Sequence, residues 1–244
     1  MPARPDLQES VDVLAVGAHP DDVEVGIGGL VRKLAHRGVR VGILDLTEGE
    51  LATRGSVEER RNEAREAARL LGVSRRANAG LPDGGLTNTK EMQAVVISHL
   101  RAFHPRVLIA SLDNDRHPDH EAAHALVRDA NYFAGLRRID TGQQPHRAGV
   151  VYYYRVYGET TPPTFVVDIT DTFDEKLAAL RAYASQLHNP TYPGEATYVS
   201  SRGLWEAIQS RAAYWGSRIG VAYGEPLYAQ TPVGLDLPPG LEIV

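Results

Sequence analysis

Two short segments of this 244-residue chain concentrate the side chains suited to catalysis. Residues 18–22 read Ala-His-Pro-Asp-Asp, and residues 117–120 read His-Pro-Asp-His. Together they supply three imidazoles and three carboxylates: His19, Asp21, Asp22, His117, Asp119 and His120. Imidazoles combined with a carboxylate form a donor set that suits zinc. The alternative is that these residues only begin helices and turns, where Asp and Pro are common.

The absence of cysteine narrows the kind of metal site. Without cysteine there are no disulfides and no Cys-rich structural zinc sites. A site built from His and carboxylates is typical of catalytic zinc, where three protein ligands leave a position open for water. Because a site of two histidines and one aspartate also binds Fe²⁺ and Co²⁺, the pattern favours zinc without excluding these ions.

Strand and helix patterns alternate along the chain and must position these segments. The predicted order is strand 11–16, helix 26–36, strand 39–46, helix 56–71, strand 77–81, helix 90–103, strand 106–110, helix 121–133, strands 150–156 and 164–168, and helices 171–187 and 201–218. Such alternation implies right-handed βαβ units. We therefore expect an α/β, Rossmann-like fold with a mostly parallel sheet and helices on both faces.

The predicted topology brings the two polar segments together. One follows the first strand and the other follows the fourth. In open α/β sheets, ligands bind outside the carboxyl ends of the strands, at the point where the strand order reverses. In a 3-2-1-4 order the first and fourth strands are neighbours at that point. We expect one domain over residues 1–244, with a loop at 135–149 and an irregular tail from about residue 224.

The overall composition excludes several classes of protein. A formal net charge of -5 offers no broad basic field, so we expect no nucleic-acid partner. No run of 18 apolar residues occurs, so we expect no membrane span. The first ten residues are polar and do not resemble a secretory signal. These features favour a cytoplasmic enzyme.

The two motifs, in this order and context, resemble the PIG-L/LmbE-like N-acetylglucosaminyl deacetylases. Further segments are similar to the bacillithiol-pathway branch of that family, which deacetylates N-acetylglucosaminyl-L-malate: residues 46–50, 53–56, 60–64, 81–84 and 165–170. The resemblance covers most of the chain. It implies a metal-dependent hydrolase that acts on a small amino-sugar substrate, and a homo-oligomer that is often a hexamer in the family.

The resemblance also implies residue roles. His19, Asp22 and His120 bind zinc, and Asp21 is the general base. His117 stabilises the oxyanion or acts as an acid, with Asp119 as its partner. We expect the Asp119 carboxylate to raise the pKa of His117 and keep that ring charged near neutral pH.

Substrate contacts are expected around the same crevice. A malyl group carries two carboxylates, which arginine binds bidentately. Arg54, Arg60 and Arg116 are the candidates, and the resemblance supports Arg60 as a substrate contact. Glu48 and Asp83 are candidates for hydrogen bonds to sugar hydroxyls. The alternatives are a solvated surface position for each arginine and simple turn chemistry for Asp83.

Two other readings compete with deacetylation. Residues 120–124 read His-Glu-Ala-Ala-His, which matches the zincin metallopeptidase pattern, with Glu121 as base and His124 as a second ligand. The segment opens a helix after a strand, however, and has no extended continuation. The second reading is a non-enzymatic nucleotide-binding Rossmann module with Asp45 as ribose contact, but the first strand lacks the Gly-rich fingerprint.

Overall fold

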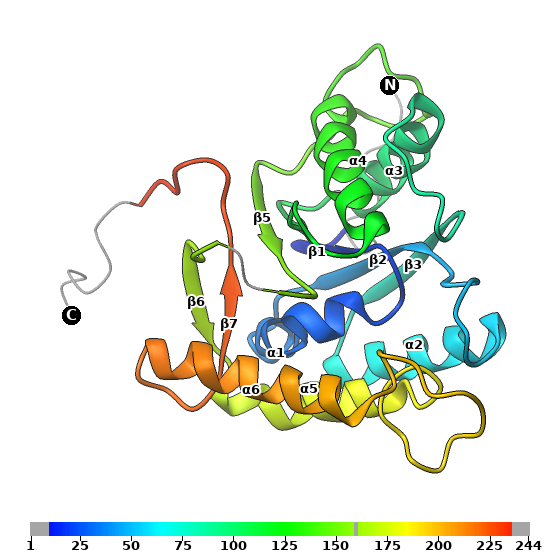
Figure 1. The fold of residues 1–244 in the computed structure, drawn as a ribbon. Coiled ribbons are helices and arrows are strands. Elements are labelled where there is room, and N and C mark those ends of the chain that lie inside the picture. The colour runs from blue at the N-terminus through cyan, green and yellow to red at the C-terminus, as the bar shows by residue number, and fades with distance from the viewer. Residues whose placement is uncertain (1–9, 159–160, 236–244) are drawn as a thin grey trace.

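A five-stranded parallel sheet forms the centre of the computed structural model, which describes residues 10–158 and 161–235. Its order is β3-β2-β1-β4-β5 (Figure 1). The strands are β1 Val13–Gly17, β2 Val41–Thr47, β3 Arg75–Leu81, β4 Val107–Ser111 and β5 Val150–Tyr154. The order confirms the predicted α/β fold class and places β1 beside β4.

Helices cover both faces of the sheet (Figure 1). One face carries α1 Asp22–His36, α2 Val57–Leu71, α5 Phe173–Ala182 and α6 Arg202–Arg218, and the other carries α3 Lys90–Phe103 and α4 Pro118–Ala134. Successive strand residues point to opposite faces, so Val13 packs toward α1 and Leu14 toward α3. The central strands β1, β2 and β4 are buried on both faces, which explains why they read as mostly apolar runs, whereas the edge strand β3 is polar and only partly buried.

A second, two-stranded sheet corrects the prediction of an irregular tail from about residue 224. Strand β7, Gly224–Leu227, pairs antiparallel with β6, Phe165–Asp168. The buried carboxylate of Glu225 holds β7 in place, because it accepts hydrogen bonds from the Leu30 amide at 2.7 Å and from Lys176 Nζ at 2.6 Å. A strand this short, containing a proline, lacks the alternation that predicts a strand.

Residues 18–22 form the turn that leads into α1, and residues 117–120 form the N-cap and first turn of α4. Helix α1 begins at Asp22 and α4 at Pro118, each several residues earlier than predicted. A 3₁₀ turn, η1 Thr170–Thr172, precedes α5, which ends at Ala182 rather than at residue 187. None of the helices in the described ranges is long and apolar enough to cross a membrane.

Candidate metal-dependent active site

The two polar segments meet at the carboxyl ends of β1 and β4, as the topology predicts. The His19 ring centroid lies 4.8 Å from that of His117 and 5.5 Å from that of His120. Both segments line a cavity of about 300 Å³, the central cavity. Its lining includes His19, Asp21, Asp22, Arg54, Arg60, Asp83, His117, His120, Tyr157 and Gln186.

The Asp22 carboxylate lies between the rings of His19 and His120, the two histidines that the motifs suggest as metal ligands together with Asp22. Its Oδ2 lies 3.5 Å from His19 Nδ1 and its Oδ1 lies 3.2 Å from His120 Nε2. Two donor atoms on one tetrahedral zinc ion lie about 3.4 Å apart when each bond is about 2.1 Å. All three side chains are buried. These side chains are of the types that bind zinc, and each histidine lies near a different oxygen of Asp22.

Two further carboxylates face the opposite nitrogen of His19. Its Nε2 lies 3.0 Å from Asp83 Oδ1 and 3.3 Å from Asp119 Oδ2. Burial disfavours a charged ring, but the hydrogen bonds with Asp119, Asp22 and Asp83 outweigh it and raise the pKa of His19 to about 12. Carboxylate partners on the far nitrogen orient a metal-binding histidine. Among the described residues, two groups of donors lie close enough together to hold a metal ion: His19 with Asp83 and Asp119, and His19 with His117 and His120. Neither group includes Asp22.

His120 has its own carboxylate partner, Asp115. Asp115 Oδ1 lies 3.2 Å from His120 Nδ1 and also accepts the amide N–H of His117 at 3.0 Å. Burial opposes charge on His120, but the charge of Asp22 and the Asp115 hydrogen bond raise the pKa of His120 to about 9. The site residues predicted from the sequence did not include Asp115. The sequence feature that could have identified Asp115 was its position two residues before His117, in the same polar loop.

Asp21 occupies a strained backbone conformation next to Asp22. Its φ is 113°, in the left-handed region that non-glycine residues rarely adopt. Its Oδ2 accepts a hydrogen bond from Arg60 Nη2 at 3.1 Å. Burial raises the pKa of Asp21 to about 7, with the charge of Arg60 opposing the rise and that of Asp22 adding to it. A carboxylate with a pKa near the working pH suits a general base.

The expectation that Asp119 keeps His117 charged is wrong. The Asp119 carboxylate accepts the Gly84 amide at 2.7 Å and turns toward His19, while the Asp119 backbone N–H donates to His117 Nδ1 at 3.2 Å. Burial, then the charges of His120 and His19, lower the pKa of His117, and they outweigh the charges of Asp22 and Asp119, which raise it. An acceptor Nδ1 leaves the proton on Nε2. His117 is thus arranged as a neutral hydrogen-bond donor.

The three candidate arginines have different positions. Arg54 and Arg60 line the central cavity, and both are buried. Arg116 is exposed and lines a second cavity of about 570 Å³. Its guanidinium carbon lies 4.4 Å from the ring centroid of Tyr157 and 3.9 Å from that of Tyr198. Because Tyr157 lines both cavities, Arg116 stands at the border of the central cavity rather than inside it.

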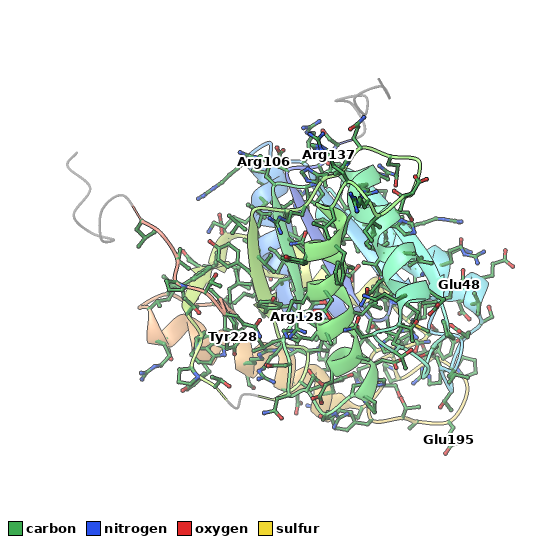
Figure 2. The ribbon with its side chains drawn as sticks, turned by 90° about the horizontal axis from the view of Figure 1, so that it is seen from above. Glu48, Arg106, Arg128, Arg137, Glu195 and Tyr228 are labelled. Atoms are coloured by element: carbon green, nitrogen blue, oxygen red, sulfur yellow. The ribbon has the colours of Figure 1, made fainter. Side chains whose placement is uncertain are left out.

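The two acidic candidates for sugar contacts also differ. Glu48 pairs with Arg61 of α2 and lies beside that helix (Figure 2), where it lines a neighbouring cavity of about 230 Å³ rather than the central one. Asp83 lines the central cavity, but its carboxylate already contacts His19 and accepts the Leu51 amide at 2.9 Å. The structure therefore brings Asp83 to the site and leaves Glu48 outside it.

Later parts of the chain complete the cavity wall without having been predicted. Tyr157 stacks on the His120 ring, with centroids 5.6 Å apart and an interplanar angle of 8°. Gln186, Thr197 and Val199 line the cavity from the irregular segment between α5 and α6. Nothing in their local sequence marks these four residues, because only the tertiary fold brings them to the site.

The geometry does not support a zincin site. His124 is buried, with Nδ1 3.0 Å from the Ser111 carbonyl oxygen and Nε2 3.2 Å from Gln230 Nε2. It belongs to neither of the close donor groups found among the described residues. Glu121 is exposed. His120 is thus shared by the two motifs in sequence but belongs to one site in space.

Asp45, the ribose contact expected of a nucleotide-binding module, also has a partner within the protein. Asp45 is buried and binds Arg76 through two hydrogen bonds, of 2.7 Å and 2.9 Å. Arg76 also donates to Glu24 at 2.6 Å. The Asp45 carboxylate therefore balances a buried guanidinium instead of facing a ribose.

Comparison with known proteins identifies the class to which this fold and site belong. Residues 14–131 match the family model of the PIG-L GlcNAc-PI de-N-acetylases. The diacetylchitobiose deacetylase of Thermococcus kodakarensis is 31% identical over 87% of this chain and 80% of its own length. A conserved Thermus thermophilus protein of known structure has 39% identity and a TM-score of 0.84, with 92% of this chain and 97% of that one covered.

The chain thus belongs to the PIG-L family of deacetylases. Another relative is the probable N-acetyl-alpha-D-glucosaminyl L-malate deacetylase 2 of Bacillus anthracis, 28% identical over 83% of this chain and 93% of the relative.

Proposed function

We propose that this protein is a zinc-dependent N-deacetylase that hydrolyses the acetamide of an N-acetylglucosamine moiety, with N-acetylglucosaminyl-L-malate as its substrate. Family membership and the deacetylases among its relatives support the reaction class. The name of the Bacillus anthracis relative and the similar sequence segments support malate. The observation that carries the proposal is the position of the Asp22 carboxylate between His19 and His120, with Asp21 adjacent.

The proposed roles follow from the geometry. His19, Asp22 and His120 would hold the zinc ion, which would supply a Lewis acid for the amide carbonyl and would lower the pKa of water. Asp21 accepts a proton from the attacking water and passes it to the leaving amine, so that acetate and a free amine are formed. The Nε2–H of His117 donates to the oxyanion. Loss of such a donor costs about 2.7–4 kcal/mol of barrier.

Amine release from two substrates tests this function. Purified zinc-loaded protein is given N-acetylglucosaminyl-L-malate or free N-acetylglucosamine, and new primary amine is quantified. We expect a higher kcat/KM for the malate conjugate. Equal values on both substrates would refute malate as the preferred aglycone and leave deacetylation in place, whereas no amine from either would refute the deacetylase itself.

Two matched carboxylate variants separate deacetylase from metallopeptidase. Asp21→Asn removes the proposed base, and we expect activity to fall by about 10²–10⁴-fold. Glu121→Ala removes the base of the zincin reading, and we expect amine release to be retained because that side chain is exposed. The reverse pattern would reject the deacetylase assignment of these residues.

The proposal extends to the metal and to the assembly. Zinc is the proposed ion, with Fe²⁺ and Co²⁺ as alternatives that the same donors accept. The family resemblance suggests a homo-oligomer as large as a hexamer, and the composition favours a cytoplasmic location. Metal analysis of the purified protein and light scattering test these two points directly.

A further inference from the structure

One arginine of the central cavity has donors without a protein partner. The Arg54 side chain lines the cavity and is only 7% exposed. Its Nε and Nη2 are buried and have no hydrogen-bond partner among the described residues. Burying part of a guanidinium without an acceptor is costly, because the lost hydration is not replaced. The Arg54 guanidinium therefore has the features of a cation that binds a ligand in this cavity.

The other arginine of the cavity, Arg60, uses its donors in hydrogen bonds within the protein. Arg60 donates from Nε and Nη2 to the Pro20 carbonyl oxygen, from Nη2 to Asp21, and from Nη1 to the Gly49 carbonyl oxygen. Its charge is balanced by Asp21. Arg60 therefore holds the loop that carries Asp21. Of the two cavity arginines, Arg54 is the one whose donors remain for an anion.

The backbone at Arg54 is fixed from behind. Gln186 Nε2 donates to the Arg54 carbonyl oxygen at 2.6 Å. Gly55 follows with φ of +73°, and a β-carbon there would lie 2.7 Å from Ser185 Oγ. Ser185 is in turn held by Glu63 through its amide at 2.7 Å and its hydroxyl at 2.6 Å. Such anchoring lowers the entropy lost when the side chain binds a ligand.

An aromatic ring packs against the guanidinium of Arg54. The Arg54 guanidinium carbon lies 4.6 Å from the ring centroid of Tyr192, whose hydroxyl donates to Glu59 Oε2 at 2.9 Å. A stacked guanidinium keeps its in-plane N–H groups for other acceptors. Two parallel N–H groups match the two oxygens of a carboxylate or phosphate.

We propose that Arg54 is the specificity-determining residue that binds an anionic group on the aglycone of the amino sugar, so that this enzyme acts on anionic N-acetylglucosaminides. This inference rests on the proposed deacetylase function. It differs from the family resemblance, which assigns substrate contact to Arg60. The shared chemistry is an oxyanion pair, supplied by either a carboxylate or a phosphate.

Three substrates and three variants test the inference. The substrates are methyl N-acetyl-α-glucosaminide, which is neutral, N-acetylglucosaminyl-L-malate and N-acetylglucosamine 1-phosphate. The variants are Arg54→Gln, Arg54→Lys and the control Arg69→Gln, which removes an exposed arginine of α2 that pairs with Glu66. The readout is the ratio of kcat/KM for each anionic substrate to that for the neutral one. Circular dichroism and melting curves check that the variants fold.

We expect Arg54→Gln to lower that ratio by about 10- to 100-fold, mainly through KM, as for loss of a charged hydrogen bond. Arg54→Lys should recover part of the loss, because it keeps the charge but not the planar fork. Arg69→Gln should leave the ratio unchanged. The anionic substrate whose ratio falls more identifies carboxylate or phosphate as the group bound. An unchanged ratio in Arg54→Gln would overturn the inference.

Calorimetry with L-malate and inorganic phosphate provides a second measurement that does not require turnover. We expect the wild type to bind one of these anions at least about ten-fold more tightly than Arg54→Gln does. If no substrate releases amine but this difference is observed, the proposed function fails while the anion site stands. Equal anion affinities in the two proteins would reject the site even if deacetylation is confirmed.

Discussion

Arg60 Nη2 donates to Asp21 Oδ2 at 3.1 Å and to the Pro20 carbonyl oxygen at 2.8 Å, so one guanidinium binds both the side chain and the preceding peptide of the strained residue. Asp21 has φ of 113° and is buried. A conformation of this kind costs about 1–3 kcal/mol and persists only where surrounding contacts enforce it. Arg60 supplies those contacts and aims the proposed base.

Replacing Arg60 by glutamine should therefore affect turnover more than substrate binding. We expect kcat to fall by about 10- to 100-fold, which corresponds to the loss of a charged hydrogen bond. Unfolding should become easier by about 1–3 kcal/mol, because Asp21 loses a buried hydrogen-bond donor. Without the charge of Arg60 the pKa of Asp21 rises further, so that Asp21 becomes protonated and a poorer base. Steady-state kinetics and urea unfolding measure the two effects. A rise in KM with kcat intact would instead support the substrate contact that the family resemblance implies.

Gly49 allows the Arg60 guanidinium to approach the loop. Its φ is +67°, and a β-carbon at this position would lie 2.2 Å from Arg60 Nη1. Gly49→Ala should destabilise the fold and also lower kcat, because both strain and a clash are introduced. Gly142 is a matched control, with φ of +68° and nothing within 4 Å of an added β-carbon.

The free energy of unfolding of the Gly142→Ala control should fall by only about 1–2 kcal/mol, which is the cost of an alanine in the left-handed conformation. Urea unfolding of Gly49→Ala and Gly142→Ala isolates the clash as the difference between them. Equal losses, with kcat unchanged in both variants, would show that Arg60 adjusts without moving Asp21.

The sequence predicted the helices and strands that have a local pattern. It also predicted that the two polar segments lie close together. Apolar runs marked the parallel strands, and their order alone placed His19 near His120. The direction in which a side chain turns is not local information. Asp119 stands next to His120 in the chain, yet its carboxylate contacts His19 and the Gly84 amide, which the sequence places far away.

The sequence also does not predict contacts between residues that only the tertiary fold brings together. Tyr157 stacks on His120 from the segment after β5, and Glu225 fixes β7 by binding the amides of α1. Neither contact has a periodicity or a motif to reveal it. The assignment of Arg60 as a substrate contact came from family resemblance, which does not report how each guanidinium donor is used in this chain.

Acidic pH should weaken the fold through the pair His104 and His146, which lie away from the central cavity. Their rings stack with centroids 3.5 Å apart, and His146 Nε2–H donates to the Pro105 carbonyl oxygen at 2.7 Å. Burial lowers the pKa of His146, and the neighbouring His104 adds to this, although the Pro105 hydrogen bond opposes it. The unfolded chain therefore binds more protons below about pH 6.5.

The stability contributed by neutral His146 should be complete above that pH and decline as the pH falls through it. Urea unfolding of zinc-saturated protein between pH 5 and 8, compared with His146→Phe, measures this (the range is about 1.5 units either side of the unfolded pKa). Phenylalanine keeps a ring on His104 but does not titrate, so its pH slope should be smaller. Parallel curves for the two proteins would contradict the assignment.

Asp115 should control metal affinity without being a ligand. It lies 3.2 Å from His120 Nδ1 and accepts the backbone amides of His117 at 3.0 Å and Tyr157 at 3.3 Å, so it orients one ligand and the loop that carries it. Asp115→Asn should weaken zinc binding by about 10- to 100-fold, the usual effect of losing such a partner. Competition with a chromogenic chelator measures the affinity.

Asp113→Asn, at an exposed position in the same loop, is the control and should bind zinc like the wild type. If both variants retain full affinity, the carboxylate of Asp115 serves the loop alone and His120 needs no partner to bind the metal.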